Sequence, residues 1–274
     1  MMAKIGIFIP CYNVAKSIEG VLRSFPEDAL KRIEEIIVVN NCSQDATLEI
    51  LKQIQSSPRL LGDKVVIIDN QENYGLGGSQ KIAYRYFLDH QFTHFYVVHG
   101  DGQGDGLTIS RNFFEVYDRD PGVDLIITSR FLKTSITDGY SRLRIFGNHV
   151  FNFLTFVLAG RWMSDSGAAI IFMKCSLLDR VPFEELTNSF QFNPELNILL
   201  MNLGGIKIIE IPLHWKDSTD QSNIAPSQYC LELLSILFRY FVNARILRKA
   251  PGLAFHDFSQ RRKMSYQILR GGHA

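Results

Sequence analysis

The chain has 274 residues, of which 46% are hydrophobic and 21% are charged, and its formal net charge is +1. A chain of this length can bury a sizeable core in one large α/β domain, with or without an appendage. The near-neutral charge excludes a general electrostatic attraction to nucleic acid, so an anionic partner has to be bound at a local site.

The sequence pattern argues against targeting and spanning segments. The N-terminal apolar run reaches Pro10 too early for a signal peptide, and no apolar run approaches the ~20 residues of a spanning helix. The four cysteines, Cys11, Cys42, Cys175 and Cys230, lack pair spacing and lie in or beside apolar sequence. We therefore expect a cytoplasmic protein with reduced thiols, in contact with membrane only at its surface.

Short apolar runs followed by polar, turn-rich loops predict the first four β-strands. They span residues 5–10, 36–39, 65–68 and 95–98. Helical patterns lie between them. The first spans residues 15–30, the second begins at a cap formed by Ser43 or Asp45 and ends at Ile54, and the third spans residues 79–89. This alternation predicts an α/β fold with a mainly parallel sheet and helices on both faces. The loops should gather at one sheet edge, where α/β proteins bind ligands.

The loop after the fourth strand combines several metal-binding side chains with glycines. His99, Asp101, Gln103 and Asp105 follow one another at alternate positions, and the glycines between them, such as Gly100, let the backbone approach a ligand closely. Mg²⁺ and Mn²⁺ take carboxylate, carbonyl and phosphate oxygens. The loop is therefore a candidate site for a divalent ion that holds a diphosphate, with an ordinary Asp/Gly turn as the alternative.

Motifs at the strand ends and beyond occur in a characteristic order. They are IPCYN at 9–13, VVNNCSQDAT at 38–47, NYGLGG at 73–78, HGDGQG at 99–104, TSRF at 128–131, DSGAAI at 165–170, FNPEL at 192–196 and EIPLHW at 210–215. Together they resemble the family-2 glycosyltransferases of the GT-A fold. The similarity is greatest to their polyprenyl-phosphate branch, the dolichyl-phosphate mannose synthase-like enzymes, and it covers roughly residues 4–225.

The resemblance implies a domain organisation and a reaction. Residues 1–225 would form a GT-A-like domain, with a nucleotide-sugar half to about residue 130 and an acceptor half at 131–225. Residues 226–274 would form a basic C-terminal appendage of amphipathic helices. The implied activity is that of an inverting, metal-dependent hexosyltransferase, which moves a sugar from a nucleoside-diphosphate sugar with the help of Mg²⁺ or Mn²⁺.

The resemblance also assigns roles to individual positions. The implied nucleotide-sugar contacts are Pro10, Tyr12, Asn13, Asn40, Asn41, Asp45, Asn73, Gly75, Gly78, Gly100 and Asp101. The implied metal ligands are Asp101, Gln103 and His99, the catalytic residues are Asp101, Asp165 and Arg130, and the acceptor residues are Asp165, Glu195 and Arg144.

The side-chain chemistry of Arg130, Asp165 and Glu195 is compatible with these roles, but each residue also has an alternative role. Arg130 can bind phosphate oxygens bidentately, and the alternative is a surface ion pair. Asp165 would be the general base for a sugar hydroxyl, whereas a lipid phosphate has a second pKa near 6 and needs no base. Asp165 would then orient a neighbour or cap a helix. Glu195 can instead be a favourable charge at a helix N-terminus.

The sequence also departs from the family pattern. Asn40 and Asn41 replace two aspartates, His99 replaces the first aspartate of the metal motif, and Ser218 and Asn223 stand where the family has basic residues. These differences indicate a distinct donor or a different clamp. An amide can still bond a base edge or a ribose hydroxyl. His99 can ligate Mn²⁺, although imidazole suits Mg²⁺ poorly.

Two apolar stretches, 143–158 and 229–247, have basic flanks that are typical of interfacial membrane helices. Packing into the core or a homo-oligomer interface is the alternative. We expect a nucleotide-sugar donor and a polyprenyl-phosphate acceptor, and no nucleic-acid partner. The alternatives are a sugar hydroxyl in surface polysaccharide synthesis and a catalytically degenerate sugar-nucleotide-binding module.

Overall fold

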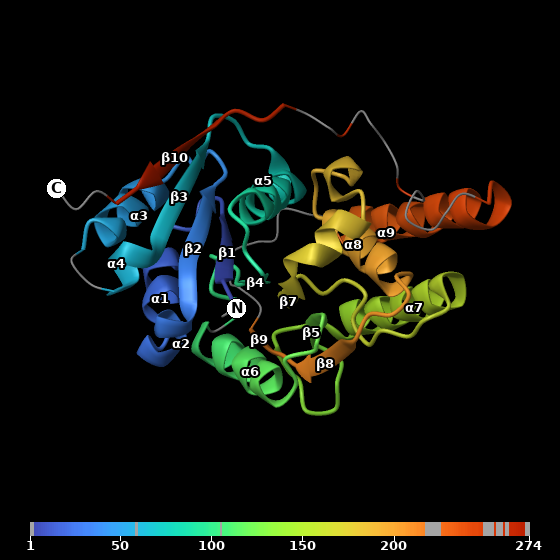
Figure 1. Cartoon of the computed structure of the whole chain (residues 1–274). Helices are drawn as coiled ribbons and strands as arrows, with labels where there is room; N and C mark the ends of the chain where they lie inside the picture. The colour runs from blue at the N-terminus through green and yellow to red at the C-terminus, as the bar shows by residue number, and fades with distance from the viewer. Residues whose placement is uncertain are drawn as a thin grey trace.

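The protein is described by a computed structural model that covers residues 3–57, 60–104, 106–216, 226–248, 255, 260 and 263–271. Within these residues the main sheet has the strand order β10-β3-β2-β1-β4-β7-β5-β8 (Figure 1). Its strands are β1 (Ile5–Cys11), β2 (Ile33–Asn40), β3 (Val65–Asn70), β4 (His94–Val97), β5 (Leu125–Ser129), β7 (Ile171–Lys174), β8 (Ile208–Pro212) and β10 (Tyr266–Arg270). A second pairing joins β6 (Ile136–Asp138) to β9 (His214–Lys216).

The sheet is parallel where the sequence predicts it to be. β3, β2, β1 and β4 pair in parallel, and so do β5 and β8. β7 is antiparallel to both β4 and β5, and β10 is antiparallel to β3. The prediction of an α/β fold with a mainly parallel sheet is therefore confirmed, and all four strands predicted before residue 99 are present.

Helices cover both faces of the sheet. One face carries α1 (Ile18–Arg23), α2 (Glu27–Arg32), α3 (Thr47–Gln55), α4 (Leu60–Lys64) and α6 (Gly106–Arg119). The other carries α5 (Gly75–Asp89), α7 (Arg142–Ala159), α8 (Phe192–Met201), α9 (Pro226–Tyr240) and the 3₁₀ turns η1 (Cys175–Arg180) and η2 (Phe183–Glu185). Alternate residues of β2 enter the two cores: Val38 packs with the first group and Val39 with the second. This two-sided burial explains why the strands are continuously apolar.

Two of the predicted helices differ from those observed. The stretch 15–30 is not one helix but α1 and α2, because Pro26 adopts an extended conformation (ψ 150°) at the start of α2. The helix predicted at 79–89 begins four residues earlier, so the glycine-rich motif lies inside α5. A Cβ on Gly75 or Gly77 would lie 2.2 Å from Asn188 O or 2.4 Å from Thr187 O. These glycines therefore let α5 pack closely against the loop that precedes α8.

The C-terminal segment is only partly helical. α9 continues into a π-helical turn, η3 (Phe241–Ile246), but residues 266–270 form β10 beside β3, across the molecule from α9 (Figure 1). The prediction of a helical appendage is therefore wrong for these residues. Pairing with β10 satisfies backbone groups that an edge strand would leave open, and Arg270 adds an ion pair to Glu35 (2.7 Å). The domain boundary at residue 225 stays a prediction.

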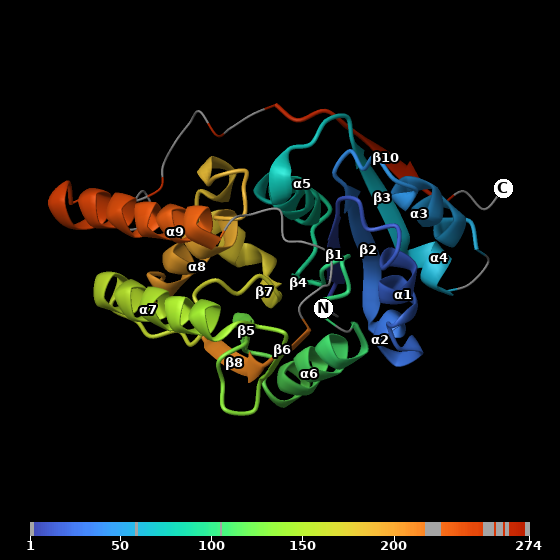
Figure 2. The ribbon, with the colours of Figure 1, turned by 180° about the vertical axis from the view of Figure 1, so that it is seen from behind.

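α7 and α9 contact each other and lie side by side, well away from β1, β2 and β3 (Figure 2). Among the described helices, none combines the length and the apolar character that crossing a bilayer requires.

Candidate active site

The loops after β1, β2 and β4 meet at the carboxyl edge of the sheet, as predicted. Asn41 N donates a hydrogen bond to Cys11 O (2.8 Å), and Gly100 N donates to Pro10 O (3.3 Å). A Cβ on Gly100 would lie 2.8 Å from Pro10 O and 2.9 Å from Cys11 Sγ, so only glycine fits this close approach. Pro10 and Gly100 thus serve the contact between two loops.

Side chains of the β1 and β2 loops fasten the two loops together. Asn13 has a positive φ of 53°, and its Oδ1 accepts a hydrogen bond from Gln44 N (2.8 Å). Asp45 accepts from Ala15 N (3.0 Å) and from Thr47 N (3.0 Å). Although burial acts to raise the pKa of Asp45, these hydrogen bonds and one from the Thr47 hydroxyl hold it below its usual value. Tyr12 is 42% exposed, so its aromatic ring is accessible at this edge of the sheet.

Asn40 and Asn41 are buried and bonded to neighbouring strand ends. Asn40 Nδ2 donates to Asp69 Oδ1 (2.7 Å), on the α3 side of the sheet. On the α5 side, Asn41 Nδ2 donates to Asn73 Oδ1 (2.8 Å), while Asn41 Oδ1 accepts from Asn70 Nδ2 (3.0 Å). The amides therefore bind one another across the strands, and their direct contact with a nucleotide stays a prediction.

The glycine-rich loop offers two well-defined groups to a cation. Asp101 is exposed, and its Oδ1 accepts from Gln103 N (3.0 Å). Burial lowers the pKa of His99, with Asp101 opposing and Arg130 reinforcing the shift, so its imidazole is neutral at pH 7. Asp105 lies outside the described residues, as do Ser218 and Asn223. Within the described part of the chain, no three His, Cys, Asp or Glu side chains gather in a way that could hold a metal.

This ligand set fits a cation that is completed by its substrate. Mg²⁺-type ions in phosphate-transfer sites use one or two carboxylates, waters and the oxygens of the bound phosphate. Asp101 and His99 can supply the protein ligands, and a donor diphosphate would supply the rest. A protein-only cage would need more acidic side chains than the described loop provides.

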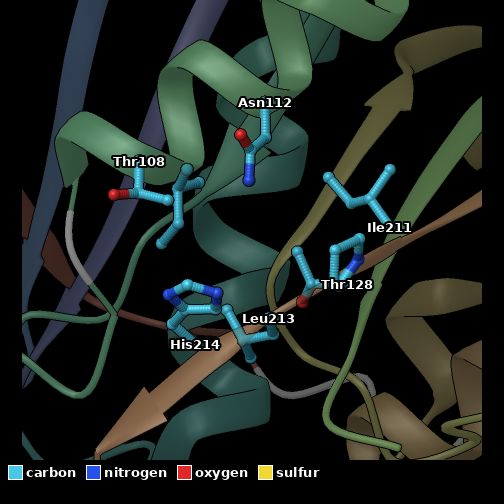
Figure 3. A pocket seen from close by; sticks show the side chains of 8 residues that line it. Thr108, Asn112, Thr128, Ile211, Leu213 and His214 are labelled. Atoms are coloured by element: carbon cyan, nitrogen blue, oxygen red, sulfur yellow. The ribbon is translucent and has the colours of Figure 1, made fainter. Parts of the chain in front are cut away.

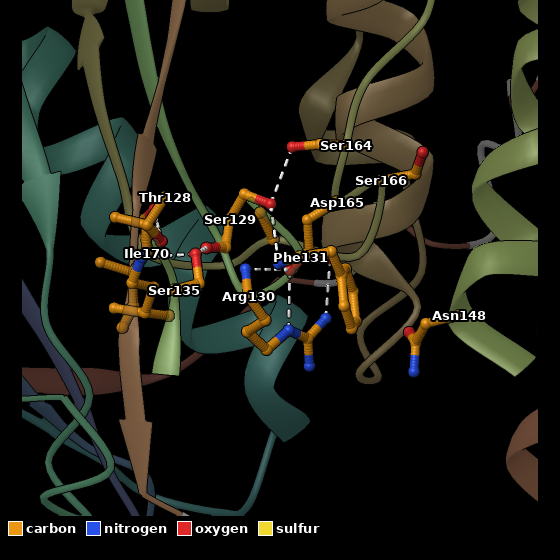
Figure 4. A network of polar contacts seen from close by, with 12 residues as sticks. Thr128, Ser129, Arg130, Phe131, Ser135, Asn148, Ser164, Asp165, Ser166 and Ile170 are labelled. Carbon is orange, nitrogen blue, oxygen red and sulfur yellow. Dashed lines mark hydrogen bonds and ion pairs between the residues drawn. The ribbon is translucent and has the colours of Figure 1, made fainter. Parts of the chain in front are cut away.

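A buried ion pair joins Arg130, just after β5, to Asp165 (Figure 4). Arg130 Nε donates to Asp165 Oδ2 (2.7 Å) and Nη2 donates to Oδ1 (2.8 Å). The side chains are only 13% and 1% exposed, so the alternative of a surface ion pair is wrong. Both carboxylate oxygens of Asp165 are engaged, which makes Asp165 a holder of Arg130 rather than a ready base.

Two aromatic rings lie beside this pair: Tyr140, which no quoted motif contains, and Trp215, the last residue of the EIPLHW motif. The Arg130 guanidinium lies 5.6 Å from the Tyr140 ring centroid and 5.7 Å from that of Trp215. The Arg144 guanidinium also lies over the Tyr140 ring, 4.1 Å from its centroid. The ring of His99 lies 6.5 Å from that of Trp215. His99, Arg130 and Arg144 thus each lie near one or both of these aromatic side chains. Trp215 belongs to a motif but was given no role, and Tyr140 carried no sequence signal.

Glu195 does not belong to this site. It is fully buried, its Oε2 accepts from Thr187 N (2.9 Å) and its Oε1 accepts from Arg239 Nη1 (3.0 Å). Burial raises its pKa despite these partners. The prediction that Glu195 contacts the acceptor is wrong, because this carboxylate ties α8 to α9 inside the core.

The buried side of α7 carries three polar side chains, Asn148, Asn152 and Thr155, beside the core residue Phe151. Asn152 Nδ2 donates to Ser164 O (2.5 Å), and its Oδ1 accepts from Ser166 N (2.9 Å), so α7 holds the loop that carries Asp165. Its outward face is apolar, with Phe146 66% and Phe153 56% exposed. A core-packing role for this stretch, one of the alternatives, does not apply to these side chains.

A small enclosed cavity lies between α6 and the strands β5 and β8 (Figure 3). Thr108, Asn112, Thr128 and His214 are among its lining residues, and its volume is about 30 Å³. This space suits one or two waters, whereas ligand pockets occupy several hundred Å³. The cavity is therefore neither a donor nor an acceptor site.

Comparison with known proteins adds independent information. Residues 6–186, two thirds of the chain, match the family model described as Glycosyl transferase family 2. A relative from Methanococcus voltae, UDP-N-acetylglucosamine–dolichyl-phosphate N-acetylglucosaminyltransferase, is 23% identical over 220 residues, which cover 76% of this chain and 83% of that protein. An uncharacterized protein of Methanocaldococcus jannaschii is 22% identical over 210 residues, covering 77% and 80% respectively.

Solved structures support the GT-A fold. Mannosyl-3-phosphoglycerate synthase from Rubrobacter xylanophilus aligns with a TM-score of 0.61 at 15% identity, covering 98% of this chain and 87% of that one. Glucosyl-3-phosphoglycerate synthase from Mycobacterium tuberculosis, in complex with Mn²⁺, UDP and glucosyl-3-phosphoglycerate, aligns with a TM-score of 0.56 at 13% identity, covering 90% and 80%. The predicted GT-A fold is confirmed by these likenesses.

Proposed function

Because the chain belongs to glycosyl transferase family 2, we propose that it moves a sugar from a nucleoside-diphosphate sugar to the phosphate of a polyprenyl lipid, with inversion at the sugar carbon. Use of a nucleotide sugar follows from the family, and the lipid acceptor is the proposal. One observation carries it: Arg130 of the buried ion pair and Arg144 both contact Tyr140, and Arg144 lies on α7, the helix that exposes large apolar side chains.

The proposed head-group site is the place where Arg130 and Arg144 meet at Tyr140. The Arg144 guanidinium lies 4.1 Å from the centroid of this ring, whereas the Arg130 guanidinium lies 5.6 Å from it and donates from Nη1 to the Tyr140 hydroxyl (3.1 Å). Planar guanidinium groups match phosphate oxygens in a bidentate manner, better than a lysine does. A phosphate here would share Arg130 with Asp165, whose carboxylate holds the guanidinium in place.

The proposed path of the lipid chain begins one residue away from Arg144. Leu143 is 78% exposed, and Phe146, Val150, Phe153 and Val157 continue the exposed face at helical spacing along α7. Leu231, Leu234 and Phe238 extend the apolar surface on the neighbouring α9. A phosphate site that leads directly onto an apolar surface is complementary to an amphiphile, and the dolichyl-phosphate acceptor in the name of the M. voltae relative supports the same acceptor class.

We propose that the same apolar face rests on the cytoplasmic surface of a bilayer. Exposed apolar surface of this extent is unfavourable in water and usually marks a partner. Arg142 at the start of α7 and Arg245 in η3 are basic residues at its margins, which favours anionic lipids by about 1 kcal/mol each. If this face instead contacts a second copy of the chain, the proposal of a bilayer contact is overturned.

The geometry favours a phosphate nucleophile over a sugar hydroxyl. In the proposed step a phosphate oxygen of the acceptor forms the new bond to the sugar carbon, and the nucleoside diphosphate leaves from the opposite side. The phosphate arrives largely ionised because its second pKa is near 6, so no base is needed. Asp165, bonded to Arg130 through both oxygens, orients the guanidinium. A divalent ion at Asp101 and His99 would neutralise charge on the departing diphosphate.

Radiolabelled sugar transfer to polyprenyl phosphate in vesicles, with Mn²⁺ and a panel of nucleotide sugars, tests the proposal. Arg144→Gln should raise the KM for the lipid phosphate by about tenfold or more, with the donor KM unchanged, because one charged phosphate contact is lost. The control is Arg111→Gln on the exposed side of α6, which should change neither. Transfer to a sugar hydroxyl but not to lipid phosphate would overturn the proposal.

The catalytic role of the glycine-rich loop has its own test. Asp101→Asn should lower turnover by about 10²–10³-fold, as loss of one electrostatic contact to a developing charge typically does. His99→Asp should retain activity and improve the use of Mg²⁺, since it restores an oxygen ligand. If the starting protein binds sugar nucleotides but shows no turnover with any donor, metal or acceptor tried, it is instead the catalytically degenerate binding module.

A further inference from the structure

Tyr74 lies in the loop of residues 71–75, between β3 and α5, and is held from two directions. Its backbone N donates to Asn41 Oδ1, directly after β2 (2.9 Å). Its hydroxyl accepts from Ser265 N (2.8 Å) and donates to Ser265 O (3.3 Å), just before β10. Gln71 N also donates to Ser265 O (3.0 Å). The side chain of Tyr74 is only 4% exposed, so it serves as an internal connection between the C-terminal segment and this loop.

The loop that Tyr74 anchors continues into the predicted donor site. Asn73 Oδ1 accepts from Asn41 Nδ2 (2.8 Å) and from Gly75 N (2.8 Å). Asn41, Asn73 and Gly75 are positions at which the sequence predicts contact with the nucleotide sugar. A continuous chain of hydrogen bonds therefore runs from Ser265 through Tyr74 to the predicted donor contacts.

β10 is attached to the sheet mainly through its backbone. Its five residues pair with β3, and the side chains of Tyr266 and Ile268 remain 40% and 43% exposed. Arg270 pairs with Glu35 (2.7 Å), but its side chain is 51% exposed, and exposed ion pairs contribute little to stability. An edge strand that buries so little apolar surface opens at a lower free energy than the central strands. We therefore expect β10 to detach without unfolding of the sheet.

We propose that the contact between Tyr74 and Ser265 is a clamp that positions the loop 71–75, so that docking of β10 sets the affinity for the nucleotide sugar. This inference rests on the proposed use of a nucleotide-sugar donor at this edge. While the clamp is closed, the loop is already ordered when the donor binds. When the clamp is open, the donor has to order the loop, which lowers its affinity. Tyr74 is thus a positioning residue that acts through the loop.

Calorimetric titration of the full chain with UDP, GDP, CDP and dTDP in the presence of Mn²⁺ identifies the diphosphate that binds most tightly, and the variants are compared on it. Tyr74→Phe keeps the ring but removes the hydroxyl, and it should weaken binding by about fivefold or more, the lower end of the usual coupling between sites. Ser265→Ala is the matched control, because the clamp uses only the backbone of Ser265, and its affinity should be unchanged. In sugar transfer, Tyr74→Phe should raise the donor KM while kcat and the acceptor KM stay the same.

Hydrogen exchange tests the same coupling without a substitution. A donor that binds more tightly when β10 is docked must stabilise the docked state by the same factor. Saturation with the diphosphate and Mn²⁺ should therefore slow exchange of the amides of β10 by about fivefold or more, beyond any slowing in β8 at the opposite edge of the sheet. Tyr74→Phe should lose this additional slowing.

Unchanged diphosphate affinity in a folded Tyr74→Phe variant would overturn the clamp while leaving nucleotide binding intact. Equal slowing of exchange in β10 and β8 would do the same, and this measurement decides the matter even if the variant does not fold. Weakening of equal size in Ser265→Ala would also contradict the clamp, since its backbone contacts remain. A folded starting protein that binds none of these diphosphates would overturn the proposed function together with the inference.

Discussion

Helices α6 and α7 both pack a phenylalanine into the core, but they differ in their polar buried side chains and in the apolar side chains that they expose. α6 buries Phe113 and Phe114 against the sheet and exposes charged residues such as Arg111. α7 buries Asn152 and exposes Phe153. The large apolar side chains of α6 pack against the protein itself, whereas α7 also exposes large apolar side chains such as Phe146 and Phe153.

The buried amide of Asn152 on α7 holds the loop that carries Asp165. Asn152 bonds to Ser164 O (2.5 Å) and Ser166 N (2.9 Å), the two residues that flank Asp165. Asp165 in turn holds Arg130. One helix thus positions the charged centre from its polar side and offers an apolar surface on the other, so the head and the chain of a lipid phosphate would be read by the two sides of α7.

The largest effect is expected from matched phenylalanines on the two helices. Phe113→Ala on α6 should lower the free energy of unfolding by about 3–5 kcal/mol, because it opens a cavity in the core. Phe153→Ala on α7 should change it by no more than about 0.5 kcal/mol. Urea denaturation of both variants measures the difference. Equal losses would mean that α7 is packed like α6.

Removing the inward polar contacts of α7 should cost less than the Phe113 cavity but more than an outward change. Asn152→Leu leaves Ser164 O and Ser166 N buried without partners, which should cost about 1–3 kcal/mol. The matched outward change, Val150→Leu, should be neutral. Thermal melts compare the two, and an Asn152→Leu variant as stable as the starting protein would show that the amide contacts do not hold the loop.

A titration beneath α6 should make the stability of the fold depend on pH. Burial lowers the pKa of His94 to about 4, with Lys174 adding to the shift and Asp124 opposing it, and Tyr117 of α6 packs on its ring. The unfolded chain, with a pKa near 6.5, binds this proton first, so stability should be full above pH 6.5 and fall towards pH 4.

His94→Phe keeps the ring packing and should flatten this part of the dependence of stability on pH. Urea midpoints at pH 7, 5.5 and 4 provide the measurement. An identical slope in the variant would assign the acid sensitivity to other groups.

The smallest effect on the fold is expected from the outer face of α7. Phe146→Ser with Phe153→Ser should leave stability within about 0.5 kcal/mol but should abolish sedimentation with anionic vesicles, since each buried phenylalanine contributes about 1.5–3 kcal/mol. Arg119→Ser on α6 is the control. If the starting protein is a dimer in solution and the double variant a monomer, with no vesicle binding in either, the face is a homo-oligomer interface.

Short-range sequence patterns predicted the strands and loops of the parallel part of the sheet. Apolar runs ending in glycine and asparagine loops predicted the parallel strands, and the loop from His99 to Gln103 was placed at the correct edge. The periodicity of residues 143–158 indicates two faces of a helix, but it cannot tell which face packs inward, since that depends on what lies beside it. Nothing local signals that residues 266–270 pair with β3.

The site was predictable residue by residue but not as a network. The sequence indicates Arg130 and Asp165 separately, yet their ion pair joins positions 35 apart in the chain, and Asn152 of α7 bonds to the loop that carries Asp165. Asp69 ends an otherwise apolar strand and carries no motif. Glu195 looked like a helix N-terminal charge, and only the packing of α9 over α8 shows that it is internal.

The most direct test of the lipid-phosphate acceptor compares two acceptors that share a head group. Transfer is measured to a long-chain polyprenyl phosphate in vesicles and to a short, water-soluble isoprenyl phosphate, for the starting protein and for Phe146→Ser with Phe153→Ser. We predict transfer to both acceptors by the starting protein, and a loss of at least about tenfold in the long-chain reaction of the variant, which keeps the short-chain reaction. Equal loss on both acceptors, or no transfer to either phosphate by the starting protein, would contradict it.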